Sequence, residues 1–172
     1  SFDLSPDGKF IVYAAKLATG KEFALHTNSK LYRYDVATAT TTELPGLSGY
    51  DGNPRISPDG RTLAFTAMPT DGYESDVNQL HLLDLTTPGA QPKRIDAAGE
   101  YVNDLKWVGA TTMVLNVTQE ASNQLLRLET KGAQPTVTPL TSGDYDFGAF
   151  DYAGKLLVAE RMDQNQANEL YT

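Results

Sequence analysis

The sequence contains no cysteine and only two histidines, His26 and His81. Without cysteine the chain has no disulfide, no thiolate nucleophile and no cysteine-ligated metal. Neither histidine has another histidine at the spacing of a metal-ligand pair. The acidic residues Asp144, Asp146 and Asp151 match no 12-residue calcium loop. We therefore expect no metal site and no cofactor.

Positive charge and long hydrophobic runs are also scarce. The chain has 14 basic and 22 acidic residues, a net charge of −8 and no run of five basic residues, which argues against a nucleic-acid partner. No stretch approaches the roughly 18 apolar residues of a membrane helix, so no membrane partner is expected. The first residues, 1–5, lack an initiator methionine and the pattern of a signal peptide. We therefore expect a piece of a longer protein.

A five-residue motif occurs twice and predicts hairpins. Ser5-Pro6-Asp7-Gly8-Lys9 recurs 52 residues later as Ser57-Pro58-Asp59-Gly60-Arg61, and each copy precedes a short β-rich run. Proline fixes φ in such a turn, aspartate hydrogen-bonds the following backbone, and glycine adopts positive φ. Degenerate copies occur at 106–111 and 150–155. The motif predicts a tight turn between two antiparallel strands.

A second element repeats in register with the first. Residues 31–36 match 80–85 and 125–130, and the chain ends on a partial copy at 170–172. Each unit of about 45 to 52 residues therefore holds four short strands, which is the size of a propeller blade. No helical periodicity persists over ten residues, and a parallel α/β fold would need such helices. A β-sandwich is the remaining alternative, but it does not explain two linked repeats.

We therefore predict an all-β fold, a β-propeller fragment of about four blades of four-stranded antiparallel sheet, the last incomplete. The predicted blades are 2–47, 52–97, 101–142 and 145–172, and together they form one domain, 1–172. A propeller normally closes into a ring, and an open arc exposes strand edges and apolar faces. We therefore expect the isolated fragment to self-associate.

Few residues are candidates for chemistry. The string Gly46-Leu47-Ser48-Gly49 lacks the spacing of a nucleophile elbow. His81 occupies a strand position held by Tyr32 and Leu126 in other repeats, which predicts a packing role, whereas His26 lies in a polar segment and is expected to be solvated. We therefore predict no catalytic residue in this chain.

Two long polar segments are the best candidates for binding. Residues 68–78 and residues 16–29 each connect the second and third strands of a predicted blade, and blade geometry does not require their length. Loops on a rigid scaffold often carry binding residues. The alternative is a solvated loop, with Tyr73 packed on a neighbouring blade.

The motifs at 57–65, 72–76 and 80–84 resemble the propeller of prolyl oligopeptidase family serine peptidases, and in particular the dipeptidyl-peptidase V and acylaminoacyl-peptidase-like branch. The segments 140–146 and 168–171 are similar to the same branch. The resemblance implies a non-catalytic portion of a serine exopeptidase, whose α/β-hydrolase domain with its Ser-Asp-His triad lies downstream in the same chain. Its propeller would gate and size short peptide substrates. The resemblance also favours a periplasmic over a cytoplasmic location.

The resemblance further implies substrate-binding residues. Propeller carboxylates of related dipeptidyl peptidases hold the free amino terminus of the peptide, and an opposed carboxylate stabilises an ammonium in a partly dry cavity. By this resemblance Glu74 and Asp76 are the candidates, with Tyr73 lining the pocket, although both acids could instead fix the loop. Two alternatives remain: a protein-interaction propeller of the periplasmic translocation type without enzymatic activity, and a propeller enzyme acting on oligosaccharides.

Overall fold

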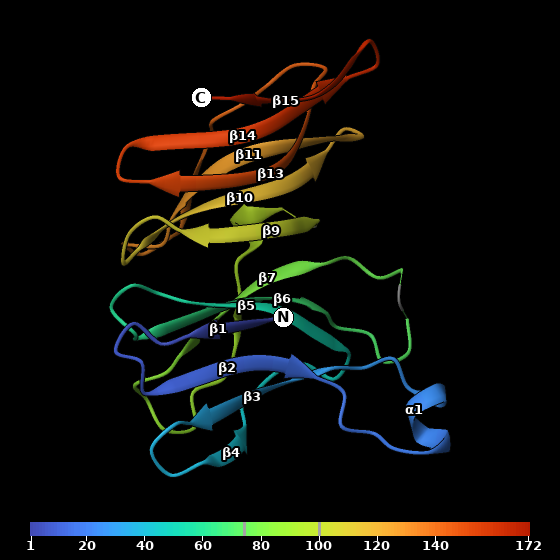
Figure 1. Cartoon of the computed structure of the whole chain (residues 1–172), viewed down its shortest axis with the longest axis vertical. Helices are drawn as coiled ribbons and strands as arrows, with labels where there is room; N and C mark the ends of the chain where they lie inside the picture. The colour runs from blue at the N-terminus through green and yellow to red at the C-terminus, as the bar shows by residue number, and fades with distance from the viewer. Residues whose placement is uncertain (74, 100) are drawn as a thin grey trace. The chain divides into compact units, whose positions relative to one another are not determined.

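The computed structural model describes residues 1–73, 75–99 and 101–172, and the strands of these residues form four antiparallel sheets (Figure 1). The contacts within the chain cluster into two units, Ser1–Asp96 and Ala97–Thr172. Each unit holds two of the sheets.

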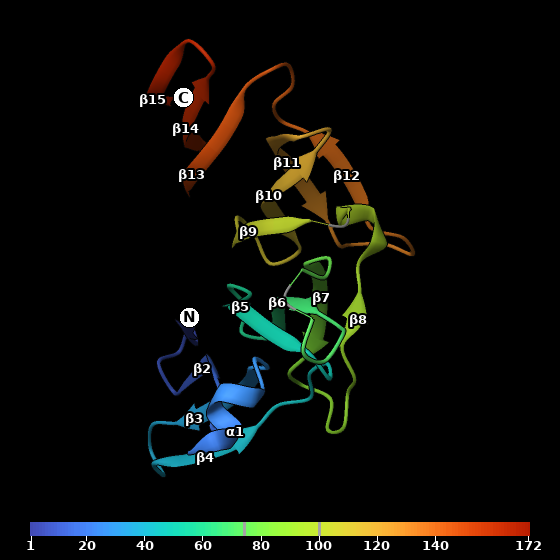
Figure 2. The same cartoon turned by 90° about the vertical axis from the view of Figure 1, so that its right-hand side faces the viewer.

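The first unit consists of two four-stranded sheets in which every strand pairs with the next along the chain. The first sheet has the order β1 (Phe2–Leu4), β2 (Phe10–Ala15), β3 (Lys30–Asp35) and β4 (Thr40–Glu43). The second, whose strands follow one another across Figure 2, has the order β5 (Tyr50–Ile56), β6 (Thr62–Met68), β7 (Gln79–Asp84) and β8 (Lys93–Arg94). Such four-stranded meanders are the sheets expected of propeller blades.

The second unit repeats this pattern after a 3₁₀ turn, η1 (Asp96–Ala98). Its first sheet contains β9 (Val102–Trp107), β10 (Thr112–Gln119), β11 (Ser122–Glu129) and β12 (Thr136–Pro139). Its second contains β13 (Asp146–Ala153), β14 (Leu156–Asp163) and β15 (Gln166–Tyr171). The last sheet thus has three strands, as predicted, and the predicted all-β fold is confirmed.

The two Ser-Pro-Asp-Gly turns have the same hydrogen bonds. In the first, Ser5 Oγ donates to Asp7 Oδ1 at 2.8 Å and accepts from the Phe10 N–H at 3.0 Å. Gly8 adopts a φ of 70°, a left-handed conformation that a residue with a Cβ resists. The Ser5 hydroxyl is the largest of the causes that lower the pKa of Asp7 to about 2. The serine of the motif therefore links both ends of the turn.

The core of the first unit lies between its two sheets. It consists of large apolar side chains from β2, β3, β5, β6 and β7: Phe10, Val12, Leu31, Ile56, Leu63, Phe65, Ala67 and Leu83. Polar groups also join the sheets, since the Asp3 carboxylate accepts the Ile56 N–H at 2.7 Å. His81 is buried and stacks on Phe65 with 5.6 Å between ring centroids, which confirms its predicted packing role.

The second unit has its own core and its own polar link between sheets. Val114, Leu125, Phe147, Phe150 and Ala159 form the buried cluster. The buried Asn116 amide on β10 donates to the carbonyl oxygens of Phe147 and Gly148 on β13, at 2.7 and 2.9 Å. A buried amide of this kind fixes which strands meet, because the carbonyls would otherwise lose their partners.

Two local features differ from the sequence expectation. The 16–29 segment contains a short helix, α1 (Lys21–Leu25), with no buried residue. A single turn of good helix formers is too short to produce a detectable periodicity, which is why the sequence did not indicate it. Strand β5 begins at Tyr50, two residues before the predicted second blade, and a register shift lies between Gly52 and Arg55. There Asn53 adopts a positive φ of 49°.

Candidate functional site

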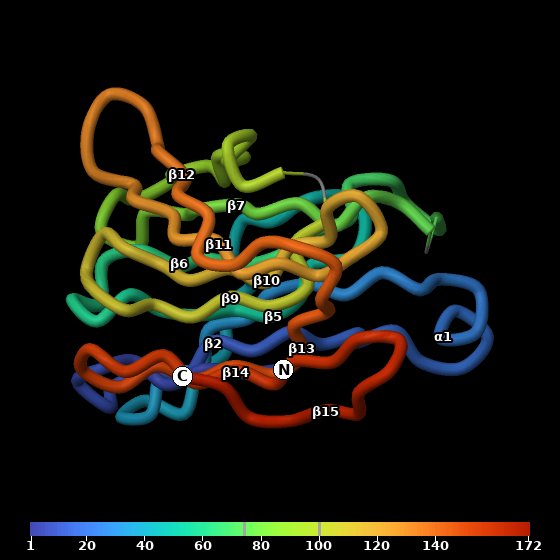
Figure 3. Tube along the Cα trace, turned by 90° about the horizontal axis from the view of Figure 1, so that it is seen from above, coloured from blue at the N-terminus to red at the C-terminus, as the bar shows by residue number. Residues whose placement is uncertain are grey.

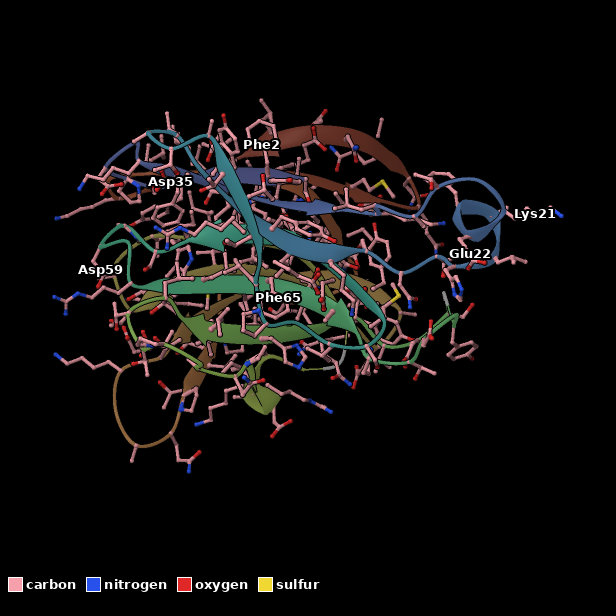
Figure 4. The ribbon with its side chains drawn as sticks, turned by 90° about the horizontal axis from the view of Figure 1, so that it is seen from below. Phe2, Lys21, Glu22, Asp35, Asp59 and Phe65 are labelled. Carbon is pink, nitrogen blue, oxygen red and sulfur yellow. The ribbon has the colours of Figure 1, made fainter. Side chains whose placement is uncertain are left out.

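Three connections leave the same end of the first unit. In a meander, the loop between the second and third strands and the crossing to the next sheet emerge at the same end. The segments 16–29, 44–49 and 69–78 therefore gather there, and we call them the loop end. Figures 1 and 3 show α1 and the loop after β6 at this end. In Figure 4, Lys21 and Glu22 of α1 lie on the opposite side from Asp35 and Asp59 of the hairpin turns.

A cavity of about 270 Å³ opens at the loop end. Its lining comes from three segments of the chain and consists of Thr27, Asn28, Tyr50, Met68, Thr70 and Tyr73. We call it the tyrosine pocket. Tyr50 is 47% exposed and Tyr73 is 55% exposed, so both rings offer apolar surface to a ligand. No described lining residue carries a formal charge.

Strand pairing places two of these side chains together. Tyr50 on β5 lies directly opposite Met68 on β6, and opposite residues of an antiparallel pair project from the same face. The next residue, Asp51, projects from the other face because side chains alternate along a strand. Tyr50 therefore reaches the pocket, whereas the Asp51 side chain is fully buried.

The Asn28 side chain joins the three segments of the loop end. Its amide nitrogen donates to the Ser48 carbonyl at 3.1 Å and to the Asp71 carboxylate. Its amide oxygen accepts the Gly72 N–H at 3.3 Å. One side chain from the 16–29 segment thus positions the crossing between the sheets and the loop that carries Tyr73.

A second set of contacts holds the 44–49 crossing against β6. Ser48 Oγ donates to the Pro69 carbonyl at 2.8 Å. Gly49 is buried, and a Cβ placed on it would lie 2.1 Å from the Met68 carbonyl oxygen, so only glycine fits. The backbone beneath the pocket is therefore closely packed and preformed.

Asp51 is a buried acid beneath this crossing. Both of its carboxylate oxygens lie 3.1 Å from the Leu47 N–H, and its backbone oxygen accepts the Ser29 hydroxyl. Burial raises the pKa of Asp51 to about 6, although the Leu47 N–H and the Lys30 ammonium act in the opposite direction. The Lys30 ammonium itself donates to the Leu47 carbonyl.

The candidate residues from sequence have different surroundings. Tyr73 lines the pocket. Asp76 accepts the Thr70 N–H at 2.9 Å and the Val77 N–H at 2.8 Å. The interaction with the Thr70 side chain is the main cause that lowers the pKa of Asp76, and the two backbone N–H groups act in the same direction. Asp76 thus closes the loop behind Tyr73. Glu74 lies outside the residues that the structure describes.

The segments named from the sequence, 16–29 and 68–78, contain Asn28 and Met68 without singling either out, whereas Ser48 and Tyr50 lie outside them and were missed. The Gly46-Leu47-Ser48-Gly49 string was a usable signal, because two glycines so close together indicate tight backbone approach. A Cβ on Gly46 would lie 2.1 Å from an Asp51 carboxylate oxygen. The pairing of Asn28 with Asp71, 43 residues apart, has no local signature.

The second unit has a larger and more polar hollow of about 570 Å³, lined by Gln119, Glu120, Ser122, Gln124, Pro139, Thr141, Ser142 and Gly143. Its buried Gln124 amide already donates to the Gly143 and Tyr145 carbonyls and accepts the Thr141 hydroxyl. The tyrosine pocket is the better candidate, because two exposed aromatic rings line it, whereas the lining residues of the larger hollow include no aromatic side chain.

The described residues contain no cluster of three or more acidic or histidine side chains that could hold a metal ion. His26 is exposed and pairs with Glu22 at 3.0 Å. In the part of the chain that the structure describes, no helix has the length and apolar character needed to cross a bilayer.

Comparison with known proteins finds relatives over nearly the whole chain. No family model matches the sequence. Dipeptidyl-peptidase 5 of Porphyromonas endodontalis is 37% identical over 169 residues, which is 98% of this chain and 24% of that protein. Dipeptidyl-peptidase 5 of Porphyromonas gingivalis is 31% identical over 173 residues, which is 99% of this chain and 25% of that protein. The chain thus spans about a quarter of the length of these curated relatives.

Solved structures show the same fold at low sequence identity. Prolyl oligopeptidase B from Galerina marginata superposes with a TM-score of 0.72 at 14% identity, over 99% of this chain and 25% of that one. The β-propeller domain of Myceliophteria thermophila Cps50 gives 0.63 at 15% identity, over 93% and 48%. TolB from Acinetobacter baumannii gives 0.60 at 20% identity, over 97% and 41%. The fold of this chain is therefore that of a β-propeller.

Proposed function

We propose that this chain, which is a propeller segment of a prolyl oligopeptidase family peptidase, gates and sizes short peptide substrates for an α/β-hydrolase domain of the same polypeptide. The propeller portion supplies no catalytic group. Hydrolysis is assigned to the hydrolase domain, and the propeller decides which peptides reach it.

The observation that carries this proposal is the tyrosine pocket on a preformed loop end. Binding residues gain most when their own positions are fixed before the ligand arrives, because the ordering cost is then already met. The Asn28 amide and the Ser48 hydroxyl provide that order here. The pocket therefore suits discrimination between peptides.

Within this function, Glu74 and Asp76 are proposed to attract the free amino terminus of the peptide, and Tyr73 to line its path. Asp76 already accepts two backbone N–H groups, so its charge contributes from a fixed position. Its lowered pKa keeps it ionised at neutral pH. Glu74 is the acid proposed to meet the ammonium directly.

The natural full-length protein tests this assignment. We expect Glu74→Gln to lower kcat/KM for dipeptidyl substrates with a free amino terminus by about tenfold to a hundredfold, since a charge-assisted bond contributes roughly 1.5–3 kcal/mol. Activity on acyl-blocked substrates should stay the same. Glu22→Gln on α1, also at the loop end, is the matched control for the change in charge. Unchanged selectivity in Glu74→Gln would end the assignment.

The size limit is tested separately. We expect kcat/KM of the same protein to fall steeply as unblocked peptides are lengthened from a few residues to folded domains. Equal activity on long, folded substrates would contradict gating. The alternative is a protein-interaction propeller, and the superposition with TolB shows a shared fold without favouring either function. A full-length protein that hydrolyses none of these peptides would support this alternative.

A further inference from the structure

We propose that the tyrosine pocket is a specificity subsite that binds one large apolar side chain of an unblocked peptide. The inference rests on the proposed peptide-gating function and names the chemistry that this end of the propeller recognises. The occupant is a side chain of phenylalanine or leucine type.

The size of the pocket indicates a single side chain. Pockets that bury whole drug-sized ligands have volumes of roughly 300–1,000 Å³. The tyrosine pocket, at about 270 Å³, is below that range. It is too small for a peptide segment and large enough for one apolar group.

The lining favours an apolar occupant. Tyr50 and Tyr73 present exposed rings, and Met68 adds a flexible, polarizable thioether between strand and loop. Aromatic rings pair well with other rings, and methionine sulfur makes favourable contacts with them. The amide of Asn28 is bonded to Ser48, Asp71 and Gly72, so it serves the scaffold.

The surrounding charge favours a peptide with a free amino end over one presenting its carboxylate. Asp71 and Asp76 flank Tyr73 in the same loop, and Asp71 contacts Asn28 in the lining. The nearby Lys30 ammonium is bonded to the Leu47 carbonyl. A carboxylate would therefore meet like charges at the rim of the pocket, whereas an ammonium would meet opposite ones.

The side chain of Met68 provides a direct readout. The chain has three methionines: Met113 is fully buried in the second unit, and Met162 lies on β14. With ¹³C-labelled methionine methyl groups, we expect the Met68 signal to shift on addition of the dipeptide Phe-Ala and to move far less with Gly-Gly. The other two methyl signals serve as internal controls.

Three variants make the test specific. Tyr50→Ala should weaken Phe-Ala binding about tenfold, because one or two apolar contacts in a pocket change affinity by roughly that factor. Tyr50→Phe should retain binding, since the ring and not the hydroxyl is required. Tyr101→Ala removes a tyrosine that is 44% exposed in the second unit and should leave binding unchanged.

The outcomes separate this inference from the function on which it rests. Equal Met68 shifts with both dipeptides, or no shift at all, would overturn the subsite even if the full-length protein is an active peptidase. A Met68 shift that depends on protein concentration without peptide would mean that a second copy fills the pocket, and would also overturn it. A selective shift supports the subsite even if gating of a hydrolase domain fails its own test.

Discussion

The buried carboxylate of Asp51, beneath the loop end, should make the stability of the first unit depend on pH, and this dependence can be measured. Its carboxylate is fully buried and its main partner is the Leu47 N–H. The charges that act on it are the Lys30 ammonium, which favours the ionised form, and the Glu43 carboxylate, which opposes it. Asparagine has the same shape and keeps an oxygen for the Leu47 N–H, so Asp51→Asn removes the charge and leaves the packing.

The free-energy cost of ionising Asp51 in the folded state follows from its pKa. Burial raises the pKa of Asp51 from 3.8 to about 6, and each pKa unit corresponds to about 1.4 kcal/mol, so ionisation of Asp51 costs the folded state about 3 kcal/mol. Below pH 3.8 the carboxyl is neutral in both states and this cost is absent. Between pH 3.8 and 6 the folded state binds more protons than the unfolded state. Stability therefore falls as the pH rises through this range, and above pH 6 the full cost remains.

The assay is urea unfolding of the wild type and Asp51→Asn at pH 4 and pH 7, followed by the NMR signals of β6. The compared quantity is the free energy of unfolding of Asp51→Asn minus that of the wild type. We expect this difference to be about 2–3 kcal/mol larger at pH 7 than at pH 4, because only the wild type loses stability as Asp51 ionises. Any constant effect of the amide cancels in this comparison. Asp84→Asn is the control, because hydrogen bonds from Thr86 and Thr87 lower the pKa of Asp84 to about 2 and its effect lies below pH 4. A pH-independent difference for Asp51→Asn would refute the reasoning.

Two further predictions concern packing and assembly. Gly49→Ala should destabilise the first unit by about 1–3 kcal/mol in urea unfolding, because its Cβ meets the Met68 carbonyl. Gly109→Ala, whose Cβ would make only ordinary contacts, should change stability little, and equal effects would contradict the close approach at Gly49. The isolated chain should self-associate at micromolar concentration in sedimentation, because Phe2 on β1 and Leu170 on β15 are 70% and 73% exposed. Phe2→Ser with Leu170→Ser should weaken this association, and a clean monomer of the wild type would contradict it.

Local physics explains why the fold was predictable. The hydrogen bonds of the Ser-Pro-Asp-Gly turns lie within six consecutive residues, as from Ser57 to Asp59 at 2.6 Å and from the Thr62 N–H to Ser57 at 2.9 Å, so a short local sequence determines the hairpin. The repeat then fixes the spacing of the strands. His81 could be assigned to the interior because other copies of the repeat hold Tyr32 and Leu126 at the same position. Each of these inferences needs only residues close in sequence or related by the repeat.

The candidate site was only partly predictable. The long 68–78 loop and Tyr73 followed from the sequence, because a loop longer than blade geometry requires is visible as an insertion. The role of Asp76 as a hydrogen-bond acceptor within that loop needed the structure, since its partner Thr70 lies six residues away. The sequence left open whether this acid fixes the loop.

The sequence by itself therefore determined the strands, the hairpin turns and the repetition of one sheet-forming unit along the chain. Only the tertiary structure decided that Asn28, Tyr50 and Tyr73 belong to one pocket, and that Asp51 is buried beneath it. The physical reason is that turns and strand patterns arise from neighbouring residues, whereas the pocket arises where three loops meet at one end of two packed sheets.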